Sequence, residues 1–209
     1  MVTGVQHSWK MPIAYFLING ITSEEKKNII NIVLMCLDEA VVKIIAFTFD
    51  DTATNIATAN ALGCDIQGNL TSIKTFFQHP SSGHDLYVLL DIVHMLKLVR
   101  NTLHSQKILF SKNGLVKWDY IQKLNQYQNS IGLKLAPKLS DRHVDFVNSK
   151  MKVCLAVQVL SNSVAGALNQ LSNIESDFED CGATAEFLSL FNDLFDVMNS
   201  MDSNAKYFK

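Results

Sequence analysis

Two adjacent acids, Asp50 and Asp51, follow an apolar segment in the stretch FTFDDTATN, residues 47–55. An apolar run that ends in a carboxylate predicts a strand whose C-terminal end faces the crevice where α/β sheets hold ligands. A hard divalent cation is bound there by carboxylate oxygens from more than one element. Alternatively, Asp50 or Asp51 caps the helix that follows, because Asp is a preferred N-cap residue. The residues alone leave both interpretations open.

A second polar group begins where the apolar segment LYVLLD, residues 86–91, ends. Asp91 and His94 are three residues apart, a spacing at which side chains on one helix face can meet. The pair is either a contact to a metal ion or phosphate, or an N-cap Asp beside an ordinary helical His. Lys97 and Arg100 continue the same face as candidates for phosphate contacts, although such residues are more often solvated.

Several common sites are absent from the sequence. It contains no GxxxxGK[ST] phosphate loop, no GxGxxG fingerprint and no nucleophile elbow. Its four cysteines form no CxxC pair, so a zinc ribbon is not indicated. With 18 Lys and Arg against 20 Asp and Glu, charge alone does not predict a nucleic-acid-binding protein. No signal core or membrane-length apolar run is present, and we expect a soluble intracellular protein.

The order of the remaining segments predicts an α/β sheet. We expect a strand at 9–18, a helix at 23–39 capped by Thr22 and Glu25, a strand buried on both faces at 41–50, a helix ending at Gly63, a loop at 67–85, a buried strand at 86–91 and a helix after it. After the turn signal Lys112-Asn113-Gly114, helical patterns dominate at about 117–129, 143–172 and 183–199. We therefore predict two domains, 1–111 and 112–209.

Six segments resemble, in the same order, the P-element family of DNA transposases, some of which carry a THAP zinc finger. They are WKMPIAYFLI, FTFDDTATNIATANALG, DIVHMLKLVRN, GLKLAPKLSDRHV, KMKVCLAVQVLSNSVAGAL and FNDLFDVMNS. The resemblance covers nearly the whole chain. It implies a fold of the α/β class, with an incomplete RNase H-like mixed sheet over 1–111, followed by part of a mainly α-helical GTP-binding insertion domain over 112–209.

The resemblance also implies a metal site. In the family, two Asp and one Glu hold two Mg2+ or Mn2+ ions that activate water or a 3′-hydroxyl for attack on a DNA phosphate. Asp50 matches the second Asp, and Asp91 with His94 matches a DxxH signature that lies close to the catalytic acids. The first Asp and the Glu are expected outside this sequence. We therefore expect that this chain alone neither cleaves nor joins DNA.

Positions implied to bind GTP are Lys138, Val153, Ser161, Asp196 and Asn199. An Asp carboxylate accepts hydrogen bonds from guanine N1 and N2, Asn199 offers an amide, and Lys138 neutralises phosphate. The family implies transposon-end DNA as a partner, possible homo-oligomers, a nuclear location and no membrane. The alternative is a non-catalytic module that binds guanine nucleotides or a full transposase. An unrelated α/β protein, in which Asp50 caps a helix, is the third possibility.

Overall fold

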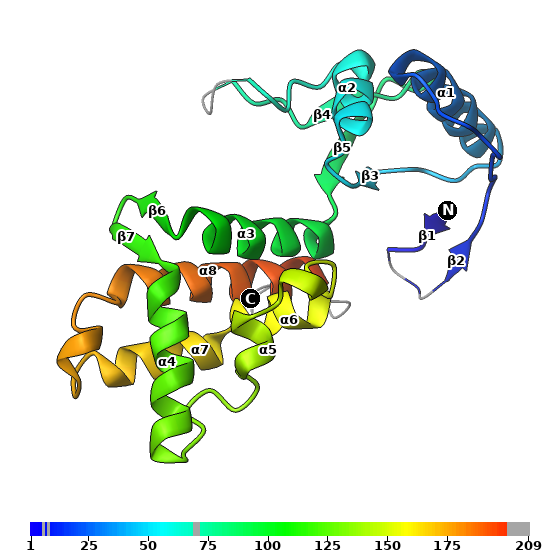
Figure 1. Cartoon of the computed structure of the whole chain (residues 1–209). Helices are drawn as coiled ribbons and strands as arrows, with labels where there is room; N and C mark the ends of the chain where they lie inside the picture. Colours follow the sequence, from blue (N-terminus) through cyan, green and yellow to red (C-terminus); the bar gives the residue numbers. More distant parts are fainter. Residues whose placement is uncertain (6, 8, 69–71, 200–209) are drawn as a thin grey trace. The chain divides into compact units, whose positions relative to one another are not determined.

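The computed structural model describes residues 1–5, 7, 9–68 and 72–199 (Figure 1). The chain divides into two compact units, Met1–Asp91 and Ile92–Lys209, called unit 1 and unit 2 below. Unit 1 contains a small mixed sheet with two helices, and unit 2 is mainly helical. The predicted fold class, an α/β part followed by a mainly α-helical part, is confirmed.

Three strands form the main sheet of unit 1, in the order β3 (Ala46–Phe49), β5 (Asp85–Leu90) and β4 (Phe76–Gln78). β3 is parallel to β5, and β4 is antiparallel to it. Helices α1 (Ser23–Glu39) and α2 (Ala53–Leu62) pack against each other. The core of this unit comprises Ile30, Leu34, Ala59, Cys64, Phe77, Leu86 and Val88. A separate pair of two-residue strands, β1 (Val2–Thr3) and β2 (Lys10–Met11), is antiparallel.

The predicted ends of the two helices are confirmed. The backbone N–H of Glu25 donates to Thr22 Oγ1 at 3.2 Å, and the N–H of Thr22 donates to Glu25 Oε2 at 2.9 Å. These reciprocal bonds satisfy two of the amide groups that a helix start leaves without partners. The hydrogen bonds from Thr22 lower the pKa of the Glu25 carboxyl. At the end of α2, Gly63 has a φ of 115°, a left-handed conformation that favours glycine.

Other predictions for unit 1 were wrong. Only Lys10–Met11 of the predicted strand 9–18 is extended and paired; the side chains of Tyr15 and Leu17 are exposed. A strand needs a neighbour that accepts its hydrogen bonds, and residues 12–19 pair with no strand in the described part of the chain. β3 is an edge strand with one exposed face rather than a strand buried on both faces. The predicted loop at 67–85 contains β4.

Unit 2 consists of helices around one hydrophobic core, with a single hairpin among its described residues. Its elements are α3 (Ile92–Gln106), β6 (Ile108–Ser111), β7 (Gly114–Lys117), α4 (Trp118–Ile131), α5 (Asp141–Val144), α6 (Val153–Val159), α7 (Asn162–Leu171) and α8 (Gly182–Asn199), with short 3-10 turns at Val147–Ser149 and Ser176–Phe178. The largest apolar side chains buried in this core are Leu96, Leu103, Trp118, Ile121, Leu124, Leu139, Phe146, Leu160 and Leu168.

The structure divides earlier than the domain change predicted near 112. Leu96 and Leu103 on α3, and Val116 on β7, are all buried in the core of unit 2. α3 therefore packs with the helices that follow it, and the division lies between Asp91 and Ile92. The Lys112-Asn113 turn joins β6 to β7 within unit 2.

The helix predicted at 143–172 is interrupted. Ser161 has extended backbone angles, φ −134° and ψ 151°, and its side chain accepts a hydrogen bond from the Val164 N–H at 3.4 Å. A serine hydroxyl that bonds the backbone in this way starts a new helix and competes with continuation of the previous one. Consequently α6 and α7 are separate helices, and Ser161 lies between them.

Arg100 is completely buried in unit 2, where its guanidinium contacts the Phe146 ring, the Lys150 carbonyl and the Asn101 amide oxygen. Its Cζ lies 3.8 Å from the centre of the Phe146 ring, and Nη2 donates to the Lys150 carbonyl at 2.7 Å. His104, on the same helix, packs edge-on against Trp118 and Phe146. Burial lowers the pKa of Arg100. Burial, and then the charges of Lys107, Lys150 and Arg100, lower the pKa of His104, against an opposing effect of Asp145.

Replacement of Leu124 by Ala should destabilise unit 2 by about 2–5 kcal/mol, because Leu124 is fully buried and the truncation leaves a cavity. The matched control is Leu133→Ala, since Leu133 is 59% exposed and its loss should change stability by about 0.5 kcal/mol or less. Urea unfolding followed by Trp118 fluorescence, in a Trp9→Phe background, measures both. Equal losses from the two variants would contradict the core assigned here.

Acidification should weaken unit 2 through His104. Its folded pKa lies below the ordinary 6.5, so its contribution to stability is present above that value and is lost as pH falls toward the folded pKa. We expect a His104→Phe variant, which keeps an aromatic ring but cannot titrate, to lose less stability than the parent between about pH 7.5 and about pH 5. Thermal unfolding across this range tests the difference, and parallel pH profiles would exclude a role for His104.

Candidate functional site

Asp50 and Asp91 directly follow the C-terminal ends of two paired strands in unit 1. β3 and β5 are parallel, Phe49 is paired with Leu90, and the Asp91 N–H donates to the Phe49 carbonyl at 2.9 Å. Each acid directly follows one of these paired residues. Because parallel strands end on the same side, the two carboxylate-bearing residues occupy neighbouring positions at the C-terminal edge, where ligands of α/β sheets bind.

The side chain of Asn55, in the first turn of α2, holds Asp50. Its Nδ2 donates to the Asp50 carbonyl at 3.2 Å and also to the Asp50 carboxylate, while its Oδ1 accepts from the ammonium of Lys26 on α1. The Thr52 N–H adds a longer contact, 3.4 Å, to Asp50 Oδ1. Thr52 is the N-cap residue of α2, so neither Asp50 nor Asp51 occupies the capping position considered from the sequence.

The chemistry of this edge suits part of a divalent cation site. Asp50 and Asp91 offer carboxylate oxygens, and Mg2+ commonly takes one or two protein carboxylates together with phosphate oxygens and water. However, the described residues contain no group of three or more His, Cys, Asp or Glu side chains placed to hold a metal ion. Asp50 as a metal ligand therefore stays a prediction.

The DxxH pair lies at the division between the units. Asp91 is the last residue of unit 1, and His94 is in the first turn of α3, which begins unit 2. Both side chains are half-buried. Their predicted role beside the catalytic acids stays a prediction.

Two of the residues predicted to bind GTP lie together in unit 2. Lys138, in the loop before α5, and Ser161, at the start of α7, line one cavity of about 210 Å3. Its wall is completed by Ala136, Leu139, Val157, Gln158, Asn162, Ser163, Val164 and Asn192. An ammonium group, a hydroxyl group and several amides thus converge on one hollow from elements that are distant in the sequence.

The other three candidates lie outside this lining. Val153 is the half-buried first residue of α6. Asp196 is on α8, one turn beyond Asn192, and its Oδ2 accepts from Asn192 Nδ2 at 2.8 Å. Asn199 is the exposed last residue of α8. Asp196 is therefore linked to the cavity through Asn192, whereas contacts of Val153 and Asn199 with a nucleotide stay predictions.

Three residues near the candidate sites were not predicted from the sequence: Asn55, Gln158 and Asn192. Asn192 precedes Asp196 by four residues in FNDLFD, a spacing that places both on one helix face and could have identified it. Gln158 Oε1 accepts a hydrogen bond from His143 Nε2 at 2.8 Å, a contact that no local pattern encodes. Asn55 lies in the same short motif as Asp50, but its orientation toward that acid depends on how α2 leaves the strand.

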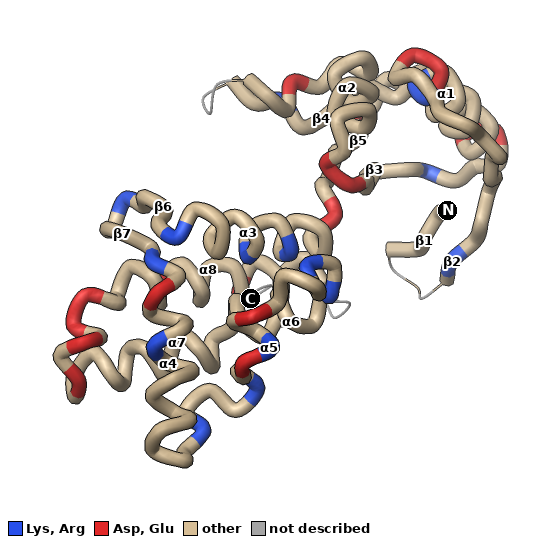
Figure 2. The backbone as a smooth tube through the Cα atoms, viewed as in Figure 1, with Lys and Arg blue, Asp and Glu red and all other residues tan. Residues whose placement is uncertain are grey.

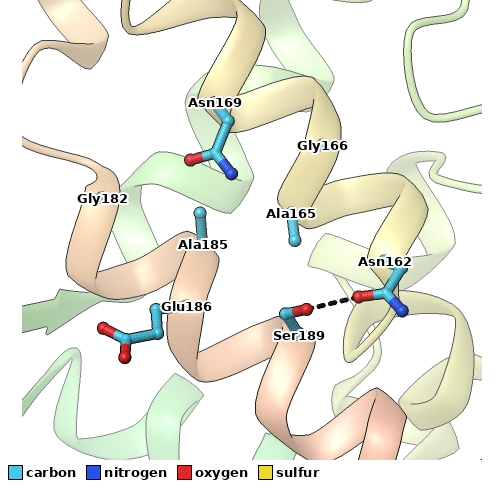
Figure 3. Close-up of a pocket in the computed structure, with 8 residues that line it drawn as sticks. All are labelled: Asn162, Ala165, Gly166, Asn169, Gly182, Ala185, Glu186 and Ser189. Atoms are coloured by element: carbon cyan, nitrogen blue, oxygen red, sulfur yellow. Dashed lines mark hydrogen bonds between the residues drawn. The ribbon is translucent and has the colours of Figure 1, made fainter.

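A larger hollow of about 500 Å3 lies between α7 and α8 (Figure 3). Small residues, Ala165, Gly166, Gly182 and Ala185, form part of its lining, and Asn162, Asn169, Glu186 and Ser189 supply the polar groups. Ser189 Oγ donates to Asn162 Oδ1 across the two helices at 2.5 Å (Figure 3). Asn162 lines both hollows, so they adjoin on α7.

Two family models match the chain. The "TNP-like, RNase H N-terminal domain" matches residues 1–63, and the "TNP-like, GTP-binding insertion domain" matches residues 93–209. In addition, no helix within the described ranges is both long and apolar enough to span a membrane.

The chain is also similar to known transposases. It is 30% identical over 211 residues to the human DNA transposase THAP9, covering 100% of this chain and 23% of that protein. It is 29% identical over 202 residues to the transposable element P transposase of Drosophila melanogaster, covering 96% and 25% respectively. The structure of the Drosophila P element transposase strand transfer complex matches with a TM-score of 0.82 and 27% identity, over 99% of this chain and 45% of that one. The chain thus spans about a quarter of the length of the two transposases and 45% of the chain in the solved complex. The RNase H-like and insertion-domain architecture implied by the sequence is confirmed.

Replacement of Asn55 by Ala should loosen the start of α2. The variant leaves the Asp50 carboxylate and the Lys26 ammonium without their shared amide, which costs about 1–3 kcal/mol when a buried partner is lost. Amide hydrogen exchange of residues 53–62, followed by mass spectrometry, reports the local opening. Asn60→Ala is the control on the same helix, since Asn60 is exposed and makes one long contact, 3.3 Å, to the Ile66 N–H. Unchanged exchange in Asn55→Ala would contradict the assigned role.

Proposed function

This chain belongs to the TNP-like family of P-element transposases, and from that premise we propose that unit 2 binds GTP and unit 1 contributes to metal-dependent DNA cleavage and strand transfer. The observation that carries the proposal is that Lys138 and Ser161 line one cavity, together with several amide side chains. The family resemblance implies that both residues bind GTP, and the cavity lies within the segment that matches the GTP-binding insertion domain.

The groups at this cavity suit a guanine nucleotide. Lys138 is exposed and supplies a positive charge for phosphate oxygens, while Ser161, Gln158 and Asn192 offer hydroxyl and amide groups. Asp196, held by Asn192, is a carboxylate that accepts from guanine N1 and N2, a pair of donors that adenine does not present. Asn199 extends the same helix as a further amide, and Val153 would contribute only an apolar contact.

The size of the cavity limits how a nucleotide can lie. At about 210 Å3 it is smaller than the ~300–1,000 Å3 of most ligand pockets. It therefore suits the base or the ribose rather than a whole nucleoside triphosphate. With Lys138 exposed beside it, the phosphates would extend over the surface.

For unit 1, we propose that Asp50 is a ligand of Mg2+ or Mn2+ and that Asp91 acts beside it, while the role of His94, which lies at the start of unit 2, stays a prediction. A bound metal ion would supply activation of water or of a 3′-hydroxyl for attack on a phosphodiester. Asn55 then orients Asp50 toward the sheet edge. The DNA would be a transposon end, with homo-oligomer formation and a nuclear location by analogy to the whole transposases.

A non-catalytic role is the second candidate. The described residues place Asp50 and Asp91 at neighbouring backbone positions but contain no group of three metal-binding side chains. A two-metal reaction needs further acids, so we propose that the chain by itself does not cleave DNA. In this alternative it acts as a guanine-nucleotide-binding or transposase-interacting module.

Isothermal titration of the chain with GTP should show binding that weakens about tenfold in Asp196→Ala and in Lys138→Gln, because each substitution removes a charge-assisted hydrogen bond. ATP should bind the parent more weakly than GTP, and Asp196→Ala should reduce that preference. Lys134→Gln is the matched control, since it removes a nearby charge that is absent from the cavity lining. Unchanged GTP affinity in both variants would refute the guanine site.

A further inference from the structure

The β6–β7 hairpin of unit 2 has one buried face and one exposed face. Leu109 and Val116 face each other across the strands on the inner side, and Val116 is completely buried. On the outer side, Phe110 is 88% exposed and is paired with Leu115, and Ile108 is 45% exposed. An exposed aromatic ring within a small apolar patch on a hairpin is typical of a contact surface rather than of a solvated strand.

Three lysines surround this outer face: Lys107 before β6, Lys112 at the turn and Lys117 at the end of β7. Figure 2 shows the Lys and Arg positions around the labelled hairpin. In the described part of the chain, the ion pairs of unit 2 include none of these three. Of the three, Lys117 makes a cation–π contact, because its ammonium lies 5.6 Å from the centre of the Tyr120 ring.

Acidic and basic residues are unevenly distributed along the sequence of unit 2, and the hairpin belongs to the basic stretch. Residues 97–152 contain 11 Lys and Arg and 3 Asp and Glu, whereas residues 175–196 contain 7 Asp and Glu and no Lys or Arg. A net charge close to zero for the whole chain conceals this division. The acidic segment includes Thr184 and Glu186, which bond the hairpin, so the positive charge that favours an anionic partner is that of Lys107, Lys112 and Lys117 themselves.

Several bonds hold the hairpin in a fixed position on unit 2. The Lys117 N–H donates to the buried hydroxyl of Thr184 at 3.0 Å, and the Trp118 N–H donates to the Lys107 carbonyl at 2.9 Å. At the turn, Asn113 Nδ2 donates to Glu186 Oε2 at 2.5 Å. Glu186 is therefore hydrogen-bonded to the turn of the hairpin. Because these bonds fix the hairpin, its outer face does not have to become ordered when a partner binds.

We propose that the outer face of the β6–β7 hairpin binds duplex DNA, with Lys107, Lys112 and Lys117 contacting phosphates and Phe110 contacting base edges. A strand of four residues extends about 13 Å, at 3.3 Å per residue. The major groove is about 12 Å wide and admits a two-stranded ribbon, where apolar side chains contact thymine methyl groups. An acidic protein surface would match the lysines but gives no role to so exposed a ring. The choice of DNA as the ligand rests on the proposed transposase function. The exposure of Phe110 and the positions of the three lysines are observations that do not depend on that function.

Fluorescence anisotropy of a labelled duplex of about 30 base pairs, titrated with the full 209-residue chain at several salt concentrations, tests the proposal. Lys107→Gln combined with Lys112→Gln should weaken binding about tenfold and reduce the slope of log K against log salt by about 1.8, or 0.9 for each lost phosphate contact. Phe110→Ser should weaken binding about fivefold and leave the salt slope unchanged, since it removes an uncharged contact.

The control combines Lys123→Gln with Lys134→Gln, which removes the same charge from unit 2 outside the hairpin and should change affinity less than about twofold. Equal losses in the two double variants, or no binding by the parent, would overturn the proposal. So would hairpin variants that keep their DNA affinity but alter self-association in sedimentation, because the surface would then bind protein. The hairpin variants should bind GTP with the same affinity as the parent. The DNA measurement therefore tests the hairpin separately from the proposed guanine site.

Discussion

The parallel pairing of β3 with β5 is the constraint on which the candidate metal edge depends. Four residues of each strand are in register, and this register places the residue after Phe49 beside the residue after Leu90. A shift by one residue would move Asp50 away from Asp91 and turn alternate side chains to the opposite face. The buried residues Leu86 and Val88 oppose such a shift, because their packing against the helices fixes which face of β5 is inward.

The arrangement around Asp50 shows how an acid directly after a strand is held by the helices that pack nearby. The amide of Asn55 reaches it from α2, and the same amide is held by Lys26 from α1. A charged carboxylate, a neutral amide and an ammonium thus form a chain of hydrogen bonds across three elements. Such a network is favourable when complete and costly when one member is missing, which couples the position of the acid to the packing of both helices.

In unit 2, the interruption at Ser161 lies in the wall of the cavity that Lys138 also lines. One continuous helix from 143 to 172 would carry its side chains along a single straight axis, without the turn at which Ser161 lies. After the break, α7 packs against α8. Asn162, the first residue of α7, accepts a hydrogen bond from Ser189 of α8. The polar side chains that accompany the break remain at the surface, while Leu160 and Val164 on either side are buried in the core.

Local chemistry was sufficient to predict the start of α1 at Thr22, the end of α2 at Gly63 and the strand at 86–91, because caps and left-handed glycines act within a few residues. The family and the general fold class also followed from the sequence. Tertiary structure decided the rest: the edge position of β3, the lack of a ladder for most of 9–18, and the inclusion of α3 in unit 2. These depend on which distant residues share a core or a hydrogen-bonded neighbour. The same holds for Lys138, Ser161 and Asn192, whose convergence follows from helix packing rather than from their spacing.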